Sequence, residues 1–421
     1  MYQKTTLDNG LRILSEEIPH VRSVSIGLWI NVGSRDETND NSGISHFIEH
    51  MMFKGTNKRT AKDIAEELDA VGGQLNAFTT KEYTCYHSKV LDEHFDLAVD
   101  VLTDMVFNSK FAPEDIDREK NVIIEEIKMY EDAPDELVHD IFTNTIWHGH
   151  PLGRPIIGTT EIVSSFSRDD LLDFHHKHYT PEKMVISVAG NIKHEKVVEK
   201  LAPILSQLKA TKTPRQSTPP QGVSNLVCRN KDTEQVHMVI GTPGYQLDHE
   251  DIYTVQLINT VLGGGLSSRL FQEIREQRGL VYTVFSYHSS YHDTGLFAVY
   301  AGLSKNNVNK AMELIFKEIK DISRHGLKES ELQRAKDQLK GGLLLSLENV
   351  NSRMSRLGKS EMYLGKVLTP DEIVGRVFKV TNEDIKRVAK NMFIPDRFTM
   401  AAIGPWQDCG ELNTALAKLK E

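Results

Sequence analysis

The fold is decided by the stretch Ser167-Arg-Asp-Asp170, which returns later in the chain as Thr381-Asn-Glu-Asp384. Both copies have the S/T-x-x-D arrangement of a capping box, in which side chains satisfy free amide groups at the start of a helix. Each predicted helix leads to a proline-containing turn and then to an apolar strand, over 184–190 in the first copy and 398–404 in the second. All paired positions are separated by 214 residues. We therefore interpret the chain as a tandem duplication.

Length and patterning predict two α+β domains. A chain of 421 residues exceeds what one hydrophobic core usually supports. Residues 210–225 have the Pro/Thr/Gln composition of an exposed linker, so the expected domains are 1–209 and 226–421. Alternating strands such as 22–31 are interleaved with amphipathic helices. Each domain is therefore expected to be a sheet backed by helices.

A helix that can bind a metal is predicted around His46-Phe-Ile-Glu49-His50. Residues four apart are neighbours on a helix, so the two imidazoles can hold one ion, and Glu49 points the same way. Nitrogen ligands favour zinc over magnesium or calcium. Asn41 and Ser42 are expected to cap the start of this helix, and Gly55 is expected to close it.

A hydrolytic zinc site normally has a third protein ligand, and the candidate is Glu126. It lies in a predicted helix two turns after Glu119, so the two carboxylates share a face. One can bind the metal while the other steadies it or a ligating histidine. Spacing alone barely separates Glu126 from Glu125, and a solvated acidic stripe is the alternative explanation.

Composition narrows the class of protein. Fifty basic and 59 acidic side chains give a net charge of −9, which argues against nucleic acid as a general partner. Three widely spaced cysteines suit a reducing compartment rather than a disulfide framework. The N-terminus has neither an apolar signal core nor an Arg-rich transit helix, and no apolar run approaches the length of a membrane span. We expect a cytoplasmic protein without membrane contact.

These motifs together resemble the pitrilysin/insulinase metallopeptidases, whose zinc motif has the order H-x-x-E-H. More narrowly, the chain is similar to the short-subunit branch that includes the β subunit of the mitochondrial processing peptidase and its bacterial relatives. The resemblance covers nearly the whole chain and includes four further segments: 6–13, 73–79, 150–155 and 278–282.

The resemblance implies specific roles. His46, His50 and Glu126 would bind zinc, Glu49 would be the general base, and Glu119 would support the site from behind the ligands. The family's domains have largely antiparallel sheets with helices on one side. The second half of the chain lacks the motif, so one zinc per chain is expected.

The resemblance also implies residues that bind substrate. Arg278 and Tyr282 would contact the substrate backbone and steady charge near the metal. The spacing alone favours the alternative, an ordinary helix-end arginine and a half-buried tyrosine. Asn76 and Ala77 match family residues that contact the peptide backbone, and Phe78 is a candidate pocket wall. If their strand lies at a sheet edge, an extended peptide can add to it. An internal strand is the alternative.

We therefore predict a zinc metalloendopeptidase that acts on short or unfolded polypeptides. The alternatives are a non-proteolytic peptide-binding or scaffold subunit of the same fold, and a zinc-dependent hydrolase of small amides or esters. Long relatives in the family place four such domains in one chain, so a two-domain chain is expected to form a homodimer. Arg278 and Tyr282 would then serve the metal of the partner chain.

Overall fold

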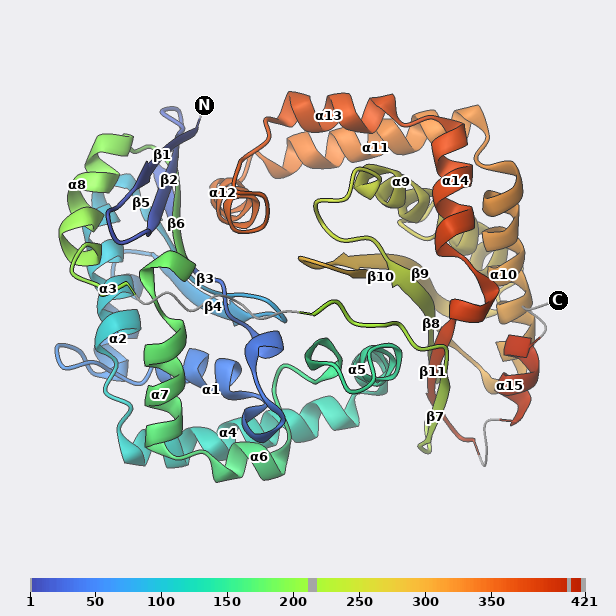
Figure 1. Cartoon of the computed structure of the whole chain (residues 1–421), viewed down its shortest axis with the longest axis horizontal. Coiled ribbons are helices and arrows are strands. Elements are labelled where there is room, and N and C mark those ends of the chain that lie inside the picture. The colour runs from blue at the N-terminus through green and yellow to red at the C-terminus, as the bar shows by residue number, and fades with distance from the viewer. Residues whose placement is uncertain (1, 211–217, 407–409, 418–421) are drawn as a thin grey trace. The chain divides into compact units, whose positions relative to one another are not determined.

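The computed structural model describes residues 2–210, 218–406 and 410–417, and Figure 1 labels its helices and strands. The chain forms two compact units. The first comprises Met1–Met129, Arg154–Gln216 and Leu345–Val367, and the second comprises Tyr130–Gly153, Ser217–Leu344 and Leu368–Glu421. In the described part of the chain, no helix is both long enough and apolar enough to cross a membrane.

The first unit is built on a six-stranded sheet. Its strand order is β1-β2-β6-β3-β5-β4, and only the β2–β6 pair is parallel. Strand β6 is buried along its whole length, and β3 is buried at every residue except its first. The strands are β1 (Tyr2–Thr6), β2 (Arg12–Glu17), β3 (Ser23–Ile30), β4 (Gln74–Thr79), β5 (Thr84–Leu91) and β6 (Met184–Gly190).

Helices of the first unit bury a large apolar core against this sheet, in which Phe47, Leu102 and Ile123 are almost completely inaccessible to solvent. The helices are α1 (Ile44–Met51), α2 (Ala61–Asp69), α3 (Phe95–Asn108), α4 (Pro113–Asp132), α6 (Thr160–Ser165), α7 (Arg168–His178), α8 (His194–Leu205) and α12 (Val350–Leu364). The last three residues of α4 fall in the second unit.

The second unit repeats the plan with five strands in the order β7-β11-β8-β10-β9, and only the β7–β11 pair is parallel. Its strands are β7 (Leu226–Asn230), β8 (Val236–Gly244), β9 (Val281–Ser290), β10 (Gly295–Leu303) and β11 (Thr399–Gly404). Its helices are α5 (Pro134–Ile146), α9 (Ile252–Leu262), α10 (Val308–His325), α11 (Glu329–Ser346), α13 (Pro370–Lys379), α14 (Asn382–Met392) and α15 (Gly410–Ala417).

The predicted fold class is confirmed, because both units are largely antiparallel sheets backed by helices. Both capping boxes are also present. Ser167 Oγ and the Asp170 carboxylate are 2.6 Å apart at the start of α7, and the same atoms of Thr381 and Asp384 are 2.7 Å apart at the start of α14. These helices lead to β6 and β11, which occupy equivalent positions in the two sheets. The duplication read from the sequence is therefore a duplication of structure.

The units exchange one helix each, so they differ from the expected segments 1–209 and 226–421. Helix α12 packs on β2, β3 and β6 of the first sheet, and α5 packs on β8 and β11 of the second. A glycine in each central strand makes room for the helix, because a Cβ atom on Gly27 would lie 2.4 Å from Met354 and one on Gly241 would lie 2.8 Å from Phe142. Of the expected linker 210–225, residues 211–217 lie outside the described residues.

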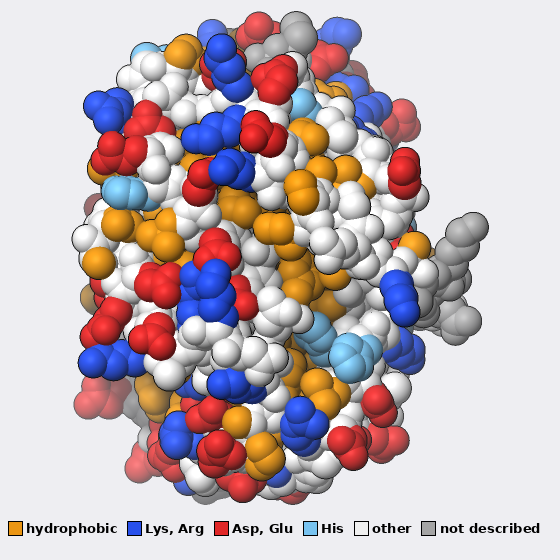
Figure 2. All heavy atoms as spheres, turned by 90° about the vertical axis from the view of Figure 1, so that its left-hand side faces the viewer, with side chains coloured by type: hydrophobic (Ala, Val, Ile, Leu, Met, Phe, Trp, Pro, Cys, Tyr) orange, Lys and Arg blue, Asp and Glu red, His pale blue; other side chains and the backbone are white. Residues whose placement is uncertain are grey.

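Charge and cysteine chemistry add two details. On the face drawn in Figure 2, acidic and basic side chains are interspersed, so neither sign of charge dominates this face. Cys85 in β5 is a buried free thiol, whereas Cys228 in β7 is disulfide-bonded. The cysteine pattern was expected to suit a reducing compartment rather than a disulfide framework, and Cys228 departs from that expectation because distance along the chain does not fix distance in space.

Candidate metal centre

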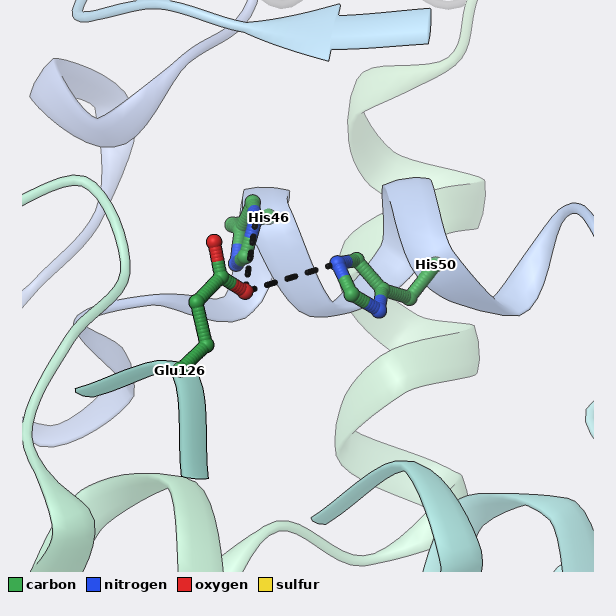
Figure 3. A group of neighbouring side chains, drawn as sticks. All are labelled: His46, His50 and Glu126. Carbon is green, nitrogen blue, oxygen red and sulfur yellow. Dashed lines mark ion pairs between the residues drawn. The ribbon is translucent and has the colours of Figure 1, made fainter. Parts of the chain in front are cut away.

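Two helices of the first unit bring together the predicted ligands. His46 and His50 project from α1, and Glu126 projects toward them from α4 (Figure 3). The Nε2 atoms of both histidines lie 3.8 Å from Glu126 Oε2. One potential ligand atom from each residue lies within 4.8 Å of the other two. The two histidines lie four residues apart in α1, so their side chains leave the same face of this short helix and can reach the same point.

The donor set fits a zinc ion. Zinc binds imidazole nitrogen and carboxylate oxygen at roughly 2.0–2.2 Å, so ligand atoms around one tetrahedral ion are about 3.4 Å apart. The observed 3.8 Å separations are close to this value and too long for hydrogen bonds. Burial, reinforced by nearby His50, lowers the pKa of His46 to about 3. The His46 ring is therefore neutral, which is the form that binds a metal.

Glu119 orients the second histidine. Its buried carboxylate lies 3.1 Å from His50 Nδ1 and 2.7 Å from Lys54 Nζ. Burial opposes ionisation of Glu119, but the contacts with His50 and Lys54 outweigh it and lower the pKa of this carboxyl. With its Nδ1–H donated to Glu119, His50 is left with Nε2 free to face the metal site.

Glu49 lies on the same helix and is held by the neighbouring strand. The hydroxyl of Thr79, the last residue of β4, donates a 2.6 Å hydrogen bond to Glu49 Oε2. Burial raises the pKa of Glu49, although the hydrogen bond from Thr79 opposes this shift. A buried carboxylate with a raised pKa has the properties of a general base.

The start of α1 is anchored differently from the prediction. Gly43, with φ of 95°, is the N-cap residue, and neither Asn41 nor Ser42 occupies that position. The buried Glu37 carboxylate accepts hydrogen bonds from the amides of Gly43 (2.8 Å) and Ser45 (2.9 Å). The helix ends at Met51, four residues before Gly55. Glu37, which lies six residues before Gly43, therefore takes the anchoring role that was expected of Asn41 and Ser42.

The structure separates the two candidate glutamates on α4. Glu126 faces the histidines with its side chain 31% exposed, whereas Glu125 points away, is 70% exposed and pairs with Lys128 at 2.7 Å. Sequence spacing did not decide which of the two glutamates faces the histidines, and in the structure Glu126 does.

The strand beside the site has a free edge. Strand β4 lies at the end of the first sheet and pairs only with β5 among the described strands. Asn76 is exposed, and its Oδ1 accepts a 2.8 Å hydrogen bond from the Ala77 amide. Phe78 is partly buried, with its ring centroid 6.0 Å from those of Trp29 and Tyr83. Of the two alternatives left open by the sequence, the structure therefore has the edge strand and not the internal one.

Comparisons with known proteins identify the family. Residues 12–160 match the family model described as Insulinase (Peptidase family M16), and residues 165–339 match the Peptidase M16 inactive domain. The chain belongs to peptidase family M16. An uncharacterized zinc protease of Bacillus subtilis, YmxG, is 48% identical over 96% of this chain and 98% of its own length. An uncharacterized zinc protease of Streptomyces coelicolor is 42% identical over 99% of this chain and 92% of its own length.

Solved structures show the same M16 fold. A protease from Helicobacter pylori has a TM-score of 0.91 and 22% identity, over 96% of this chain and all of that chain. A peptidase M16 inactive domain from Pseudomonas fluorescens also has a TM-score of 0.91, with 19% identity over 96% of this chain and 98% of that chain. The two-unit architecture is therefore shared across distant sequences.

Arg278 and Tyr282 belong to the second unit of this M16 protein. Arg278 Nη1 lies 2.6 Å from the Glu273 carboxylate, and Tyr282 near the start of β9 is 71% exposed. The guanidinium of Arg275 lies 5.8 Å from the centroid of the Tyr282 ring. Their role in substrate binding stays a prediction.

Three residues of the M16 site were missed in the sequence. Lys54 could have been found, because it follows His50 by four positions, but α1 stops before it. Thr79 lies inside the quoted strand 73–79, although nothing local marks it as a partner of Glu49. Glu37 carries no signal at all, since its contact with α1 forms only through folding.

Proposed function

We propose that this M16 protein is a zinc-dependent endopeptidase that cleaves short or unfolded polypeptides. The observation that carries the proposal is the convergence of His46, His50 and Glu126 beside the buried carboxylate of Glu49. The names of its relatives as zinc proteases support the same reading.

The chain's own residues divide the chemistry between them. When bound, zinc supplies Lewis acidity that polarises the scissile carbonyl and lowers the pKa of water. Glu49 is the group that takes a proton from the attacking water and returns it to the leaving amine. Glu119 and Lys54 keep the His50 ring in one tautomer and orientation.

The open edge of β4 supports an extended peptide as substrate. Free N–H and C=O groups at a sheet edge can pair with any peptide backbone, so this mode accepts many sequences but requires an unfolded or flexible chain. The backbone of Ala77 would pair with the substrate backbone, the exposed side chain of Asn76 would contact it, and Phe78 would line a side-chain pocket. This requirement favours polypeptides over small amides or esters.

We also propose that the working enzyme is a homodimer in which Arg278 and Tyr282 serve the metal centre of the other chain. The exposure of Tyr282 supports a contact outside its own unit. Mixing a Glu49→Gln chain with an Arg278→Ala/Tyr282→Phe chain tests this arrangement. Recovered cleavage in mixed dimers supports it, whereas no recovery in demonstrated mixed dimers contradicts it.

A peptide-cleavage assay tests the central proposal. Purified chain should cleave quenched fluorescent peptides, lose activity with a chelator and regain it with zinc. Glu49→Gln should retain one zinc per chain while losing about 10²–10⁴-fold in rate. Peptide binding without cleavage in the zinc-loaded wild type would instead indicate a scaffold, and cleavage of small esters alone would indicate a different hydrolase.

A further inference from the structure

The backbone of β4 shows which residues face its open edge. Thr80 N donates to Tyr83 O at 2.8 Å, and Thr79 is paired with Thr84 in an antiparallel register without a shift. In such a ladder hydrogen-bonded and non-hydrogen-bonded pairs alternate. Asn76 and Phe78 therefore direct their N–H and C=O groups to β5. Those of Leu75, Ala77 and Thr79 point to the open edge.

Glu49 lies where this open edge ends. Thr79 donates its hydroxyl to Glu49 Oε2 at 2.6 Å, and its backbone N–H also interacts with the Glu49 carboxylate. One step earlier on the same edge, the amide of Ala77 is bonded to Asn76 Oδ1 at 2.8 Å, a contact that a peptide carbonyl can replace. A peptide paired along Leu75 and Ala77 is thus directed to the Glu49 carboxylate.

We propose that Thr79 is a positioning residue that fixes the Glu49 carboxylate at the end of the substrate-binding edge. The backbone of Thr79 sets the register of the docked peptide, and its hydroxyl sets the position of the general base. One residue therefore aligns the scissile bond with Glu49. This inference rests on the proposed function and deepens it by assigning the alignment step.

A purely structural role for Thr79 is the competing explanation. Its hydroxyl is 3.4 Å from Thr84 Oγ1, and Thr84 itself donates to Val32 O at 3.0 Å. Removing the hydroxyl of Thr79 or that of Thr84 disturbs this part of the sheet. Of these two residues, only Thr79 contacts Glu49. Thr84→Val is therefore a matched control.

The kinetic test compares Thr79→Val, Thr79→Ser and Thr84→Val. Thr79→Val keeps the shape of the side chain but removes the donor, so kcat should fall about 10- to 100-fold because a misplaced catalytic group costs about that much. KM and the zinc content of one per chain should stay unchanged. Thr79→Ser should restore kcat to within about threefold of the wild type, and Thr84→Val should leave kcat unchanged. Wild-type kcat in Thr79→Val would overturn the inference while leaving the proposed function intact.

Two further measurements do not depend on turnover. A crystal structure of metal-free Thr79→Val should show the Glu49 carboxylate displaced from the edge of β4, and an unmoved carboxylate would overturn the inference. Calorimetry in a Glu49→Gln background should show equal affinity for an extended peptide with and without the Thr79→Val substitution, and a loss above about tenfold would mean that Thr79 acts in binding instead. If wild-type enzyme cleaves no peptide although Glu49 moves in the Thr79→Val crystal, the proposed function fails and the positioning contact stands.

Discussion

The two sheets of this molecule have equivalent strands in equivalent order, but within the described residues only the first unit has a His/His/Glu group that could hold a metal ion. Strand β1 is the one addition to the first sheet. Helix α1 carries His46, Glu49 and His50, whereas α9 of the second unit contains no histidine and no carboxylate. At the offset of 214 residues, Lys340 in α11 corresponds to Glu126 in α4. The architecture therefore survives without the site, and a few side chains decide the chemistry.

The largest expected difference between the halves is in zinc binding. Glu126→Gln should weaken zinc affinity more than about 100-fold, because it removes one of three ligands of a site worth several kcal/mol. Glu125→Gln and, in the second half, Lys340→Met should both keep one zinc per chain. Metal analysis after dialysis measures all three. Zinc loss from Glu125→Gln in place of Glu126→Gln would break the assignment of the helical phase.

The two equivalent helices are anchored by different carboxylates. Asp251 before α9 contacts both Nη atoms of Arg387 at 2.6 and 2.7 Å. The anchor of α1 is Glu37, and burial raises the pKa of Glu37 to about 7, above its ordinary value near 4.5. A carboxyl with a raised pKa binds its proton more tightly in the folded state, so its contribution to stability falls as pH rises from about 4.5 to 7.

As pH rises from about 4.5 to 7, the wild type should therefore lose unfolding free energy relative to Glu37→Gln, by at most about 3 kcal/mol. Above about pH 7.5 the difference in unfolding free energy between the two proteins should no longer change with pH. Chemical denaturation at several pH values measures it. A constant difference from about pH 5 to 7.5 would show that Glu37 titrates normally.

The packing of α12 on the first sheet and of α5 on the second should differ in how well it tolerates a larger residue in the strand beneath the helix. A Cβ atom on Gly241 would meet the backbone oxygen of Phe297 and the ring of Phe142, whereas one on Gly27 would meet side chains only, the flexible end of Met354 and the indole nitrogen of Trp29. Gly241→Ala should therefore lower stability by about 3 kcal/mol and Gly27→Ala by about 1 kcal/mol.

The control for this pair is Gly375→Ala, because Gly375 lies in α13 with open space around it. That substitution should raise stability by about 0.4–1 kcal/mol through reduced freedom of the unfolded chain. Denaturant midpoints of the three variants give the ranking. Equal losses at Gly27 and Gly241 would mean that the two sheets accommodate their helices in the same way.

The last expected effect concerns Lys54, which contacts Glu119 behind the metal-binding residues of the first half. Lys54→Met should weaken zinc binding about 10-fold, since supporting residues behind a ligand typically contribute about 10- to 100-fold. Lys58→Met is the control, because Lys58 pairs with exposed Asp100 away from Glu119. Competition with a zinc chelator measures both affinities. An unchanged affinity in Lys54→Met would show that Glu119 holds His50 without help.

The sequence predicted the parts of the site that depend on local periodicity. The i, i+4 histidines and the two-turn spacing of Glu119 and Glu126 are properties of single helices, so they could be read directly. The strand over 73–79 was expected from the family resemblance, and β4 occupies residues 74–79 of it. The contacts of Glu37 with the start of α1, six and eight residues along the chain, and of Thr79 with Glu49, 30 residues away, could not be read, because neither spacing follows a helix or strand period. The exchange of α5 and α12 was also missed, since an amphipathic pattern predicts a helix but not the sheet it covers.

The exchange of helices also governs how the protein is made. All six strands of the first sheet have been synthesised by Gly190, but α12 begins only at Val350, which is 160 positions later. At about 5–20 residues per second the ribosome needs roughly 8–30 seconds for this stretch. During that time the face bearing Trp29 has no helix to cover it and is a candidate surface for chaperones or for aggregation. The second sheet avoids this interval, because α5 leaves the ribosome before any of its strands.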